Sequence, residues 1–327
     1  MRPQRVPASV VASPQCLLAA RAALIARLTG ILYNPARAAR ETRMAFPPIG
    51  ILTDFGSADA YVGVMKAVIA SIAPEAPIVD VSHAVPPGDV HHGAFLLWQA
   101  APYFPPGSIL LAVVDPGVGT PRRGVALAFE DFLCVGPDNG LFTYLLSTRR
   151  CLQAFELRSE ELRLAHISAT FHGRDVFAPA AAHLARGIPI RQFGPVANNL
   201  KMLPLPKLRM VDGPGLEGEV IHIDHFGNAV TSIGSLQAEA AAIHFAPWLP
   251  GGEARTIARR GLGVHLPGGR QLPLCRTFAD VQPGEPLAYI GSSGLLELAI
   301  HGGRAADALG LARGLPITLG YERSAET

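Results

Sequence analysis

The stretch SILLAVV, residues Ser108–Val114, is followed at once by Asp115, and it decides the fold class of this chain. Six apolar residues in a row leave no polar face, which is typical of a strand covered on both sides in a parallel sheet. Asp115 then falls at the end of that strand, where α/β folds usually place their functional groups. The stretch therefore predicts an α/β domain, with Asp115 as a candidate site residue.

On both sides of this strand, the sequence alternates between short apolar runs and segments with apolar residues at helical spacing. The predicted strands are Ile49–Thr53, Ile78–Val81, Gly124–Phe129 and Phe132–Val135, and the predicted helices are Tyr61–Ile72, Val90–Ala101 and Asp175–Arg186. Strands that alternate with helices predict an α/β N-terminal domain with a mostly parallel sheet, over residues 47–200.

The pattern changes after about residue 195, where prolines and glycines make a turn-rich connection. Short strand-like runs separated by turn signals follow, and a single helix, Gly294–His301, is predicted among them. The predicted strands are Gly218–Asp224, Ala229–Ile233, Gly263–Leu266 and Leu287–Ile290. We expect a smaller all-β, barrel-like C-terminal domain over residues 201–327.

The composition excludes several classes of protein. Of 327 residues, 49% are hydrophobic and 17% charged, which excludes a mainly disordered chain. Residues 44–327 carry 21 basic and 25 acidic side chains, so the charge gives no support to a nucleic-acid partner. No segment approaches the ~18 continuous apolar residues of a membrane helix, and no membrane partner is expected.

The four cysteines are scattered along the chain, without the paired spacing of a zinc site or a disulfide framework. They are Cys16, Cys134, Cys151 and Cys275. Free buried thiols in a reducing cytoplasm are the simpler interpretation, and we expect a cytoplasmic protein.

Residues 1–46 form an Arg/Ala-rich extension, with seven arginines and one glutamate in residues 1–43. An organellar targeting peptide has such a composition. An upstream start codon, with the working chain beginning at Met44, is the alternative. In either case we expect the extension to be dispensable for the fold.

Two polar clusters lie at strand ends in the first half of the α/β domain. Asp54, in the string TDFG (53–56), can accept two hydrogen bonds from a sugar diol, or it can simply cap the following helix. Arg122 follows Asp115 by seven residues across a Gly-containing turn, so its side chain can fold back over that carboxylate. A structural Asp–Arg pair that fastens a loop is the alternative.

Two further clusters lie at later junctions. His172, in FHGRD (171–175), can act as a base or orient a water, and it can also be purely structural. Asn228, in IDHFGN (223–228), could offer a donor and an acceptor to an adenine edge, although Gly-Asn is also common in a hairpin turn.

Other sequence motifs do not predict a functional site. The histidines near Asp89 and Asp224 match no recognised zinc spacing, so no metal is expected. No GxGxxG follows a strand and no GxxxxGK[ST] is present, so dinucleotide and P-loop chemistry lose their usual support.

Taken together, the clusters resemble the S-adenosyl-L-methionine hydroxide adenosyltransferase family, which also contains the fluorinase and the chlorinase. The resemblance runs from about Ile49 to about Leu311 and rests on eight strings in order: TDFG (53–56), YVGVMK (61–66), IVDVSH (78–83), VVDPGVGTPRR (114–123), VGPDNGL (135–141), FHGRDVFAPAAA (171–182), IDHFGN (223–228) and GSSGLLELA (291–299).

The resemblance implies a homotrimer in which S-adenosylmethionine lies between the N-terminal domain of one subunit and the C-terminal domain of its neighbour. In the N-terminal domain it implies that Asp54 binds the ribose hydroxyls and Phe171 lines the ribose–adenine pocket. In the C-terminal domain it implies that Asp224 meets the methionine amino group, Asn228 the adenine, and Ser292 with Ser293 the methionine carboxylate region.

Asp115, Arg122 and His172 match the triad that holds the nucleophilic water in hydroxide-forming members of the family. The implied reaction is attack of water on the ribose C5′, which gives adenosine and L-methionine. We expect no cofactor, with S-adenosylmethionine as the substrate, and the sulfonium needs no acid because methionine leaves as a neutral thioether. Either His172 or Asp115 can be the group that accepts the proton, and the sequence leaves both open.

Two alternatives remain. A halogenase of the same fold is disfavoured, because the Asp115 carboxylate would repel a halide and the short Arg123–Gly136 segment leaves no room for the fluorinase loop insertion. A non-catalytic S-adenosylmethionine or adenosine sensor is also possible, but binding alone would not need the water-site triad. Ser293 stands where a halogenase can place Arg in the methionine-binding loop, so we expect backbone and hydroxyl donors to hold the carboxylate.

Overall fold

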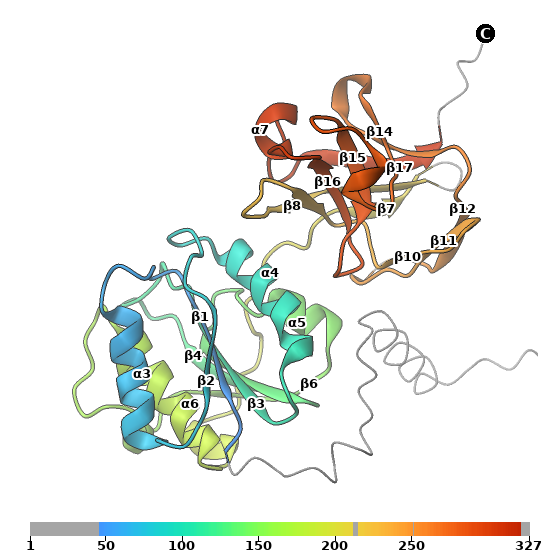
Figure 1. Cartoon of the computed structure of the whole chain (residues 1–327). Helices are drawn as coiled ribbons and strands as arrows, with labels where there is room; N and C mark the ends of the chain where they lie inside the picture. Colours follow the sequence, from blue (N-terminus) through green and yellow to red (C-terminus); the bar gives the residue numbers. More distant parts are fainter. Residues whose placement is uncertain (1–45, 212–214, 251, 322–327) are drawn as a thin grey trace, which may run out of the picture.

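The computed structural model describes residues 46–211, 215–250 and 252–321, which form two lobes joined by an extended connection (Figure 1). The predicted extension therefore lies outside the described residues up to residue 45. In the described parts of the chain, no helix is both long enough and apolar enough to cross a membrane.

The first lobe is built on a six-stranded sheet with the order β2-β1-β3-β5-β4-β6. Strands β2, β1, β3 and β5 run parallel, and β4 pairs antiparallel with both β5 and β6. The strands are β1 (Ile49–Thr53), β2 (Ile78–Ser82), β3 (Ser108–Val113), β4 (Gly124–Phe129), β5 (Phe132–Pro137) and β6 (Cys151–Glu156). The predicted α/β fold with a mostly parallel sheet is confirmed, although β6 was missed in the sequence.

The apolar run in β3 is buried on both faces, as its composition predicts. Ile109, Leu111 and Val113 pack under α3 (Tyr61–Ile72) and α6 (Ala178–Ala185). Leu110 and Ala112 face the opposite layer, which contains α4 (Val90–Ala100) and α5 (Thr143–Thr148). Successive residues of a strand point to opposite faces, so one run serves two cores.

The predicted helix Asp175–Arg186 differs from the structure at its beginning. The chain forms a single π-helical turn over Gly173–Phe177 and becomes α-helical at Ala178–Ala185. Pro179, which has no N–H to donate, lies in the first turn of α6, directly after the π-helical turn. The wide turn matters because His172 immediately precedes it.

The second lobe is a sheet with the order β14-β13-β17-β8-β9-β16-β15, with β7 paired to β8 outside that path. All its ladders are antiparallel, and a bridge between Leu274 and Ala288 brings the two ends together, so the sheet nearly closes into a barrel. Its strands are β7 (Leu208–Met210), β8 (Leu216–Ile223), β9 (Ala229–Thr231), β13 (Leu262–His265), β14 (Gln271–Pro273), β15 (Pro286–Ile290), β16 (Leu296–Ile300) and β17 (Pro316–Tyr321).

Smaller elements complete the chain. A separate three-stranded sheet contains β10 (Leu236–Ala238), β11 (Ala242–Phe245) and β12 (Arg255–Ala258). Short 3₁₀ turns occupy Ala101–Tyr103, Glu160–Leu162, Ile190–Phe193, Pro267–Gly269 and Phe278–Asp280, and a short helix, α7, spans Ala305–Leu309.

The predicted helix Gly294–His301 is wrong, because Leu296–Ile300 forms strand β16 between β9 and β15. Leu296, Leu298 and Ile300 point into the barrel core, and Glu297 points to the other face, where the Tyr289 hydroxyl donates to it. A short apolar run fits a buried strand as well as a helix, and pairing on both sides decides between them.

Helix α4 lies on the side of the first lobe that faces the second lobe (Figure 1). The rings of Phe95 and His92 pack against His222 of β8, and Trp98 packs against Trp248. At the beginning of the same helix, Asp89 forms an ion pair with Arg313, 2.8 Å from Oδ1 to Nη1. The lobes therefore share an apolar contact with a charged pair beside it.

Candidate active site

Neighbouring strands bring Asp54 and Asp115 to the same edge of the sheet. Thr53, the last residue of β1, lies opposite Val113, the last residue of β3, and both carboxylates follow these strand ends. This is the edge where open α/β sheets bind ligands.

Asp115, Arg122 and His172 form one connected group at this edge. Arg122 Nε lies 2.9 Å from both Asp115 carboxylate oxygens, and Nη2 donates to Oδ2 as well. Nη2 also lies 2.8 Å from Nδ1 of His172. The Arg122 and Asp115 side chains are 6% and 5% exposed, so the charged pair is almost completely removed from water. The predicted return of Arg122 over Asp115 is confirmed.

The turn after β3 explains this return. Gly119 has φ +78°, and a Cβ there would lie 2.6 Å from the carbonyl oxygen of Ala169. Glycine is required at such a position, both for the left-handed backbone and for the close approach. This close contact packs the turn at Gly119 against Ala169, three residues before His172. It thereby brings His172 close to Asp115 and Arg122.

The contact with Arg122 fixes the tautomer of His172. A guanidinium can only donate, so Nδ1 accepts, and the proton of the neutral imidazole is on Nε2. Burial and the nearby Arg122 charge lower the pKa of His172, and these effects outweigh the opposing carboxylates. At neutral pH the group therefore presents an N–H donor on Nε2, and its Nδ1 lone pair is already used.

An aromatic wall lies beside the triad. Phe171 makes edge contacts with Phe55 and Tyr61, with ring centroids 5.9 and 5.3 Å apart. Gly173 makes this packing possible, because a Cβ there would meet both Phe171 and Phe55 at 3.3 Å. Tyr61 is still 50% exposed. The predicted lining residue Phe171 thus belongs to the same edge as the triad, and Phe55 and Tyr61 are members that sequence reasoning missed.

Two of the predicted C-terminal residues, Asp224 and Asn228, contact each other in one turn. Asp224 accepts hydrogen bonds from the backbone N–H of Asn228 at 2.8 Å and from its amide Nδ2 at 2.9 Å. The hairpin interpretation is correct as geometry, since these bonds close the turn between β8 and β9. The turn holds the amide of Asn228 in one orientation and leaves its oxygen for another partner. Phe226, at the tip, is 71% exposed.

Ser292 and Ser293 lie in the turn between β15 and β16. Ser292 is exposed, whereas the hydroxyl of Ser293 is buried and has no hydrogen-bond partner among the described residues. Buried hydroxyls are normally satisfied, so this one is suited to an incoming polar group.

Among the described residues, hydrogen bonds join Asp115, Arg122 and His172 to one another and Asp224 to Asn228, and no hydrogen bond or ion pair joins the candidate residues of one lobe to those of the other. We call the candidate residues of the two lobes the first and the second cluster. The first cluster contains Asp54, Asp115, Arg122, Phe171 and His172, and the second contains Asp224, Asn228, Ser292 and Ser293.

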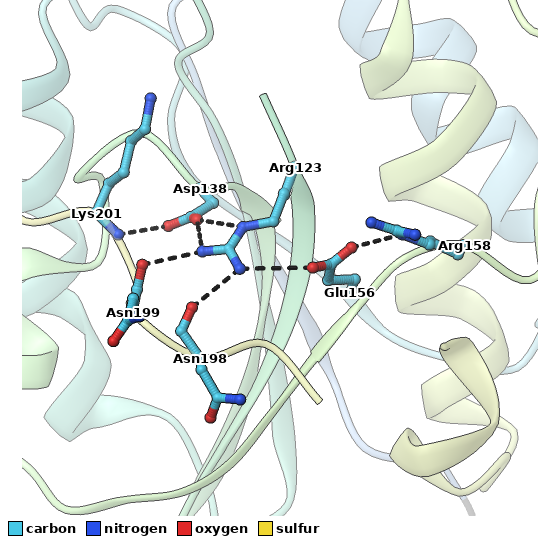
Figure 2. Close-up of polar contacts among 7 residues, drawn as sticks. All are labelled: Arg123, Asp138, Glu156, Arg158, Asn198, Asn199 and Lys201. Atoms are coloured by element: carbon cyan, nitrogen blue, oxygen red, sulfur yellow. Dashed lines mark hydrogen bonds and ion pairs between the residues drawn. The ribbon is translucent and has the colours of Figure 1, made fainter. Parts of the chain in front are cut away.

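Arg123, next to the triad, belongs to a different network (Figure 2). It donates to Asp138 through Nε at 2.9 Å, to Glu156, and to the backbone oxygens of Asn198 and Asn199. Asp138 in turn accepts from the backbone N–H of Lys201. Of the two adjacent arginines, Arg122 therefore belongs to the candidate site, whereas Arg123 holds the segment 198–201 against the sheet.

Known proteins share both parts of this architecture. The models for the SAM hydroxide adenosyltransferase N-terminal and C-terminal domains match residues 49–194 and 218–318. The chain belongs to the SAM hydroxide adenosyltransferase family.

Curated members of this family include an (R)-S-adenosyl-L-methionine hydrolase of Thermus thermophilus, 46% identical over 83% of this chain and 99% of the relative. One of Salinispora tropica is 43% identical over 84% of this chain and 98% of the relative. A fluorinase of Actinoplanes is 30% identical over 84% of this chain and 97% of the relative. A solved structure of an uncharacterized conserved protein from Thermotoga maritima has a TM-score of 0.72 and 34% identity, and covers 83% of this chain and 99% of that one.

No three His, Cys, Asp or Glu side chains converge as metal ligands in the described parts of this family member. The imidazole of His92 packs against the ring of His222, and Asp89 is bound by Arg313. His92 and Asp89 thus have structural partners, and a metal-free reaction stays a prediction.

Proposed function

We propose that this chain hydrolyses S-adenosylmethionine to adenosine and L-methionine by attack of water on the ribose C5′. The observation that carries the proposal is the buried Asp115–Arg122–His172 group, located at the ligand-binding edge of a sheet in a chain of this family. The hydrolase relatives, at 43–46% identity, are more similar to this chain than the fluorinase relative at 30%.

In the mechanism we propose, the triad holds one water in line with the C5′–sulfur bond. The Nε2–H of His172 donates to the water oxygen, and Asp115 accepts one of its protons. The oxygen becomes strongly acidic as its bond to carbon forms, so a carboxylate is basic enough to take the proton. Arg122 holds both Asp115 and His172 in place through its hydrogen bonds. Positioning of this kind can supply roughly 7–11 kcal/mol, and no general acid is needed because the leaving group is a neutral thioether.

The remaining candidate residues bind the substrate in this proposal. Asp54 holds the ribose hydroxyls, and Phe171 lines the sugar and base. Asp224 meets the methionine ammonium, and Asn228 meets the adenine. Ser292 and Ser293 meet the methionine carboxylate, which the unpartnered Ser293 hydroxyl supports.

We further propose a homotrimer in which the first cluster of one subunit faces the second cluster of its neighbour. The proposal is supported by the exposed aromatic side chains beside each cluster, Tyr61 and Phe226, which a neighbouring subunit would cover. A head-to-tail interface of this kind closes into a ring. We also propose a cytoplasmic location, in agreement with the free thiols of Cys134, Cys151 and Cys275.

The decisive experiment is mass spectrometry of the purified protein incubated with S-adenosylmethionine in ¹⁸O-water with chloride present. The relatives are named for the (R) form, so the two sulfonium epimers are supplied separately. Adenosine with ¹⁸O at its 5′-oxygen, together with free methionine, is expected. A 5′-chloro product would favour the halogenase, and ligand binding without turnover would favour the sensor.

A further inference from the structure

The strings YVGVMK and IVDVSH contribute three polar side chains that the proposed reaction does not use. They meet in one chain of contacts. Lys66 Nζ lies 2.7 Å from Asp80 Oδ2, Asp80 Oδ1 lies 3.1 Å from His83 Nε2, and His83 Nδ1 lies 2.8 Å from Thr53 Oγ1. This Lys–Asp–His–Thr relay joins α3 and β2 to the end of β1, next to Asp54.

With the His83 proton on Nε2, each of the three contacts in the relay joins one donor to one acceptor. The ionised Asp80 can only accept, so Nε2 of His83 carries the proton and Nδ1 accepts the hydroxyl proton of Thr53. Burial alone would raise the pKa of Asp80, but the hydrogen bonds from Lys66 and His83 and the positive charge of Lys66 outweigh it and lower that pKa. The relay is therefore polarised in one direction, from the hydroxyl of Thr53 to the carboxylate of Asp80.

The far end of the relay holds the Asp54 loop. Thr53 Oγ1, which gives its proton to His83, accepts the backbone N–H of Phe55 at 3.3 Å. The backbone oxygen of His83 accepts the N–H of Gly56 at 2.8 Å. A bulge aligns these groups, because Ile51 lies opposite Asp80 but Leu52 lies opposite Ser82, which skips one residue of β2.

The loop that follows His83 also holds Asp54 directly. Its Oδ2 accepts the N–H of Gly88, 2.8 Å away, in the loop that follows His83. Among the described residues, Oδ1 has no hydrogen bond. A carboxylate that binds a vicinal diol must point each of its two oxygens at one of the two hydroxyls. A small rotation of this loop would therefore weaken both hydrogen bonds to the diol at once.

We propose that Lys66, Asp80, His83 and Thr53 are positioning residues that set the plane of the Asp54 carboxylate for the 2′,3′-diol of the substrate ribose. This inference rests on the proposed function, in which Asp54 binds the ribose. Thr53 is completely buried, so it does not itself touch substrate. The relay therefore affects how tightly the diol is bound. The chemical step depends on Asp115, Arg122 and His172.

The test compares the binding of adenosine and of 2′,3′-dideoxyadenosine by calorimetry on the full chain. The wild-type protein is expected to prefer adenosine at least about tenfold, the value of one or two hydrogen bonds to a charged group. Thr53→Val, which has nearly the same shape without the hydroxyl, is expected to reduce this preference to about threefold or less. Thr53→Ser keeps the hydroxyl and is expected to restore it.

Asp80→Ala provides a second variant at a more exposed position, in case the buried substitution prevents folding. It is expected to lose the preference and to raise KM with little change in kcat. Glu160→Gln, which removes the charge of an exposed ion pair far from β1 in the sequence, is the matched control and is expected to keep the wild-type preference.

The outcomes separate the two proposals. A wild-type protein that does not distinguish the two nucleosides would contradict the ribose role of Asp54, and with it this part of the proposed function. A wild-type preference that survives intact in Thr53→Val and Asp80→Ala would refute the relay and leave the proposed function in place.

Discussion

Nη2 of Arg122 lies 2.8 Å from Nδ1 of His172, and this contact decides which nitrogen of the imidazole is free. Because a guanidinium has no acceptor, the lone pair of Nδ1 is occupied and the proton is on Nε2. The sequence left His172 and Asp115 open as the proton acceptor. The geometry favours Asp115 as the acceptor and His172 as a donor to the water oxygen.

This assignment predicts different results for two substitutions of His172. His172→Ala removes the donor, and turnover should fall about 100-fold, the scale of a lost acid–base group. His172→Gln places an amide N–H close to the position of Nε2, so it should retain clearly more turnover than the alanine variant. Equal losses in single-turnover assays of both variants would instead indicate that His172 is the base. His166→Ala, at an exposed histidine, is the control.

Asp115→Asn should lower turnover at least about 100-fold, because the amide cannot accept the proton and no longer matches the charge of Arg122. Binding of adenosine, measured separately, should change much less, since Asp115 contacts the water and not the nucleoside in this proposal. Turnover close to the wild-type value would remove Asp115 from the mechanism.

Arg123→Ala should act on stability and not on chemistry. Its partner Asp138 is 4% exposed, and the substitution would leave that carboxylate with the Lys201 N–H but without its cation. We expect the free energy of unfolding to fall by about 3 kcal/mol, the lower end for a broken buried pair. Denaturant titration measures this loss, and turnover per folded molecule should stay near wild type. Glu160→Ala, at an exposed pair, should change stability by less than about 1 kcal/mol.

His222 predicts a pH dependence of stability. Burial, and then the charge of His92, lower the pKa of His222 to about 4, whereas an unfolded histidine titrates near 6.5. Between about pH 4 and 6.5, His222 is protonated in the unfolded chain but not in the folded one. The stability that the neutral His222 contributes is therefore complete above pH 6.5 and is lost as the pH falls toward 4. The difference amounts to about 3 kcal/mol at most.

The measurement compares urea unfolding at pH 4.5 and pH 7 for the wild type and for His222→Phe, which keeps a ring between Phe95 and His92. The variant should lose less stability on acidification than the wild type. Equal losses would show that other histidines with lowered pKa values, such as His91 and His92, carry the effect.

The proposed assembly predicts complementation between two inactive variants. Asp54→Ala removes the first cluster and Asp224→Ala the second, so neither variant alone should turn over substrate. If each site combines the two clusters of neighbouring subunits, mixed and refolded trimers should recover about a quarter of the wild-type activity at random mixing. No recovery, despite trimers seen by native mass spectrometry, would locate both clusters of a site in one subunit.

The sequence by itself determined the fold class and the identity of the candidate residues. The unbroken apolar run Ile109–Val114 predicts a strand buried on both faces, with the residue after it at the edge of the sheet, and the structure confirms that strand. Local rules of this kind connect near neighbours in the chain, so they also found the helices Tyr61–Ile72 and Val90–Ala100.

Tertiary structure decided whatever depends on partners that are distant in the sequence. The run at Leu296–Ile300 suits a helix or a strand, and its pairing with β9 and β15 makes it a strand. The tautomer of His172 depends on an arginine 50 residues away, and the Thr53–His83 contact spans 30 residues and a bulge. The direction of a side chain in space depends on the packing of the whole domain, and the order of the residues alone does not contain it.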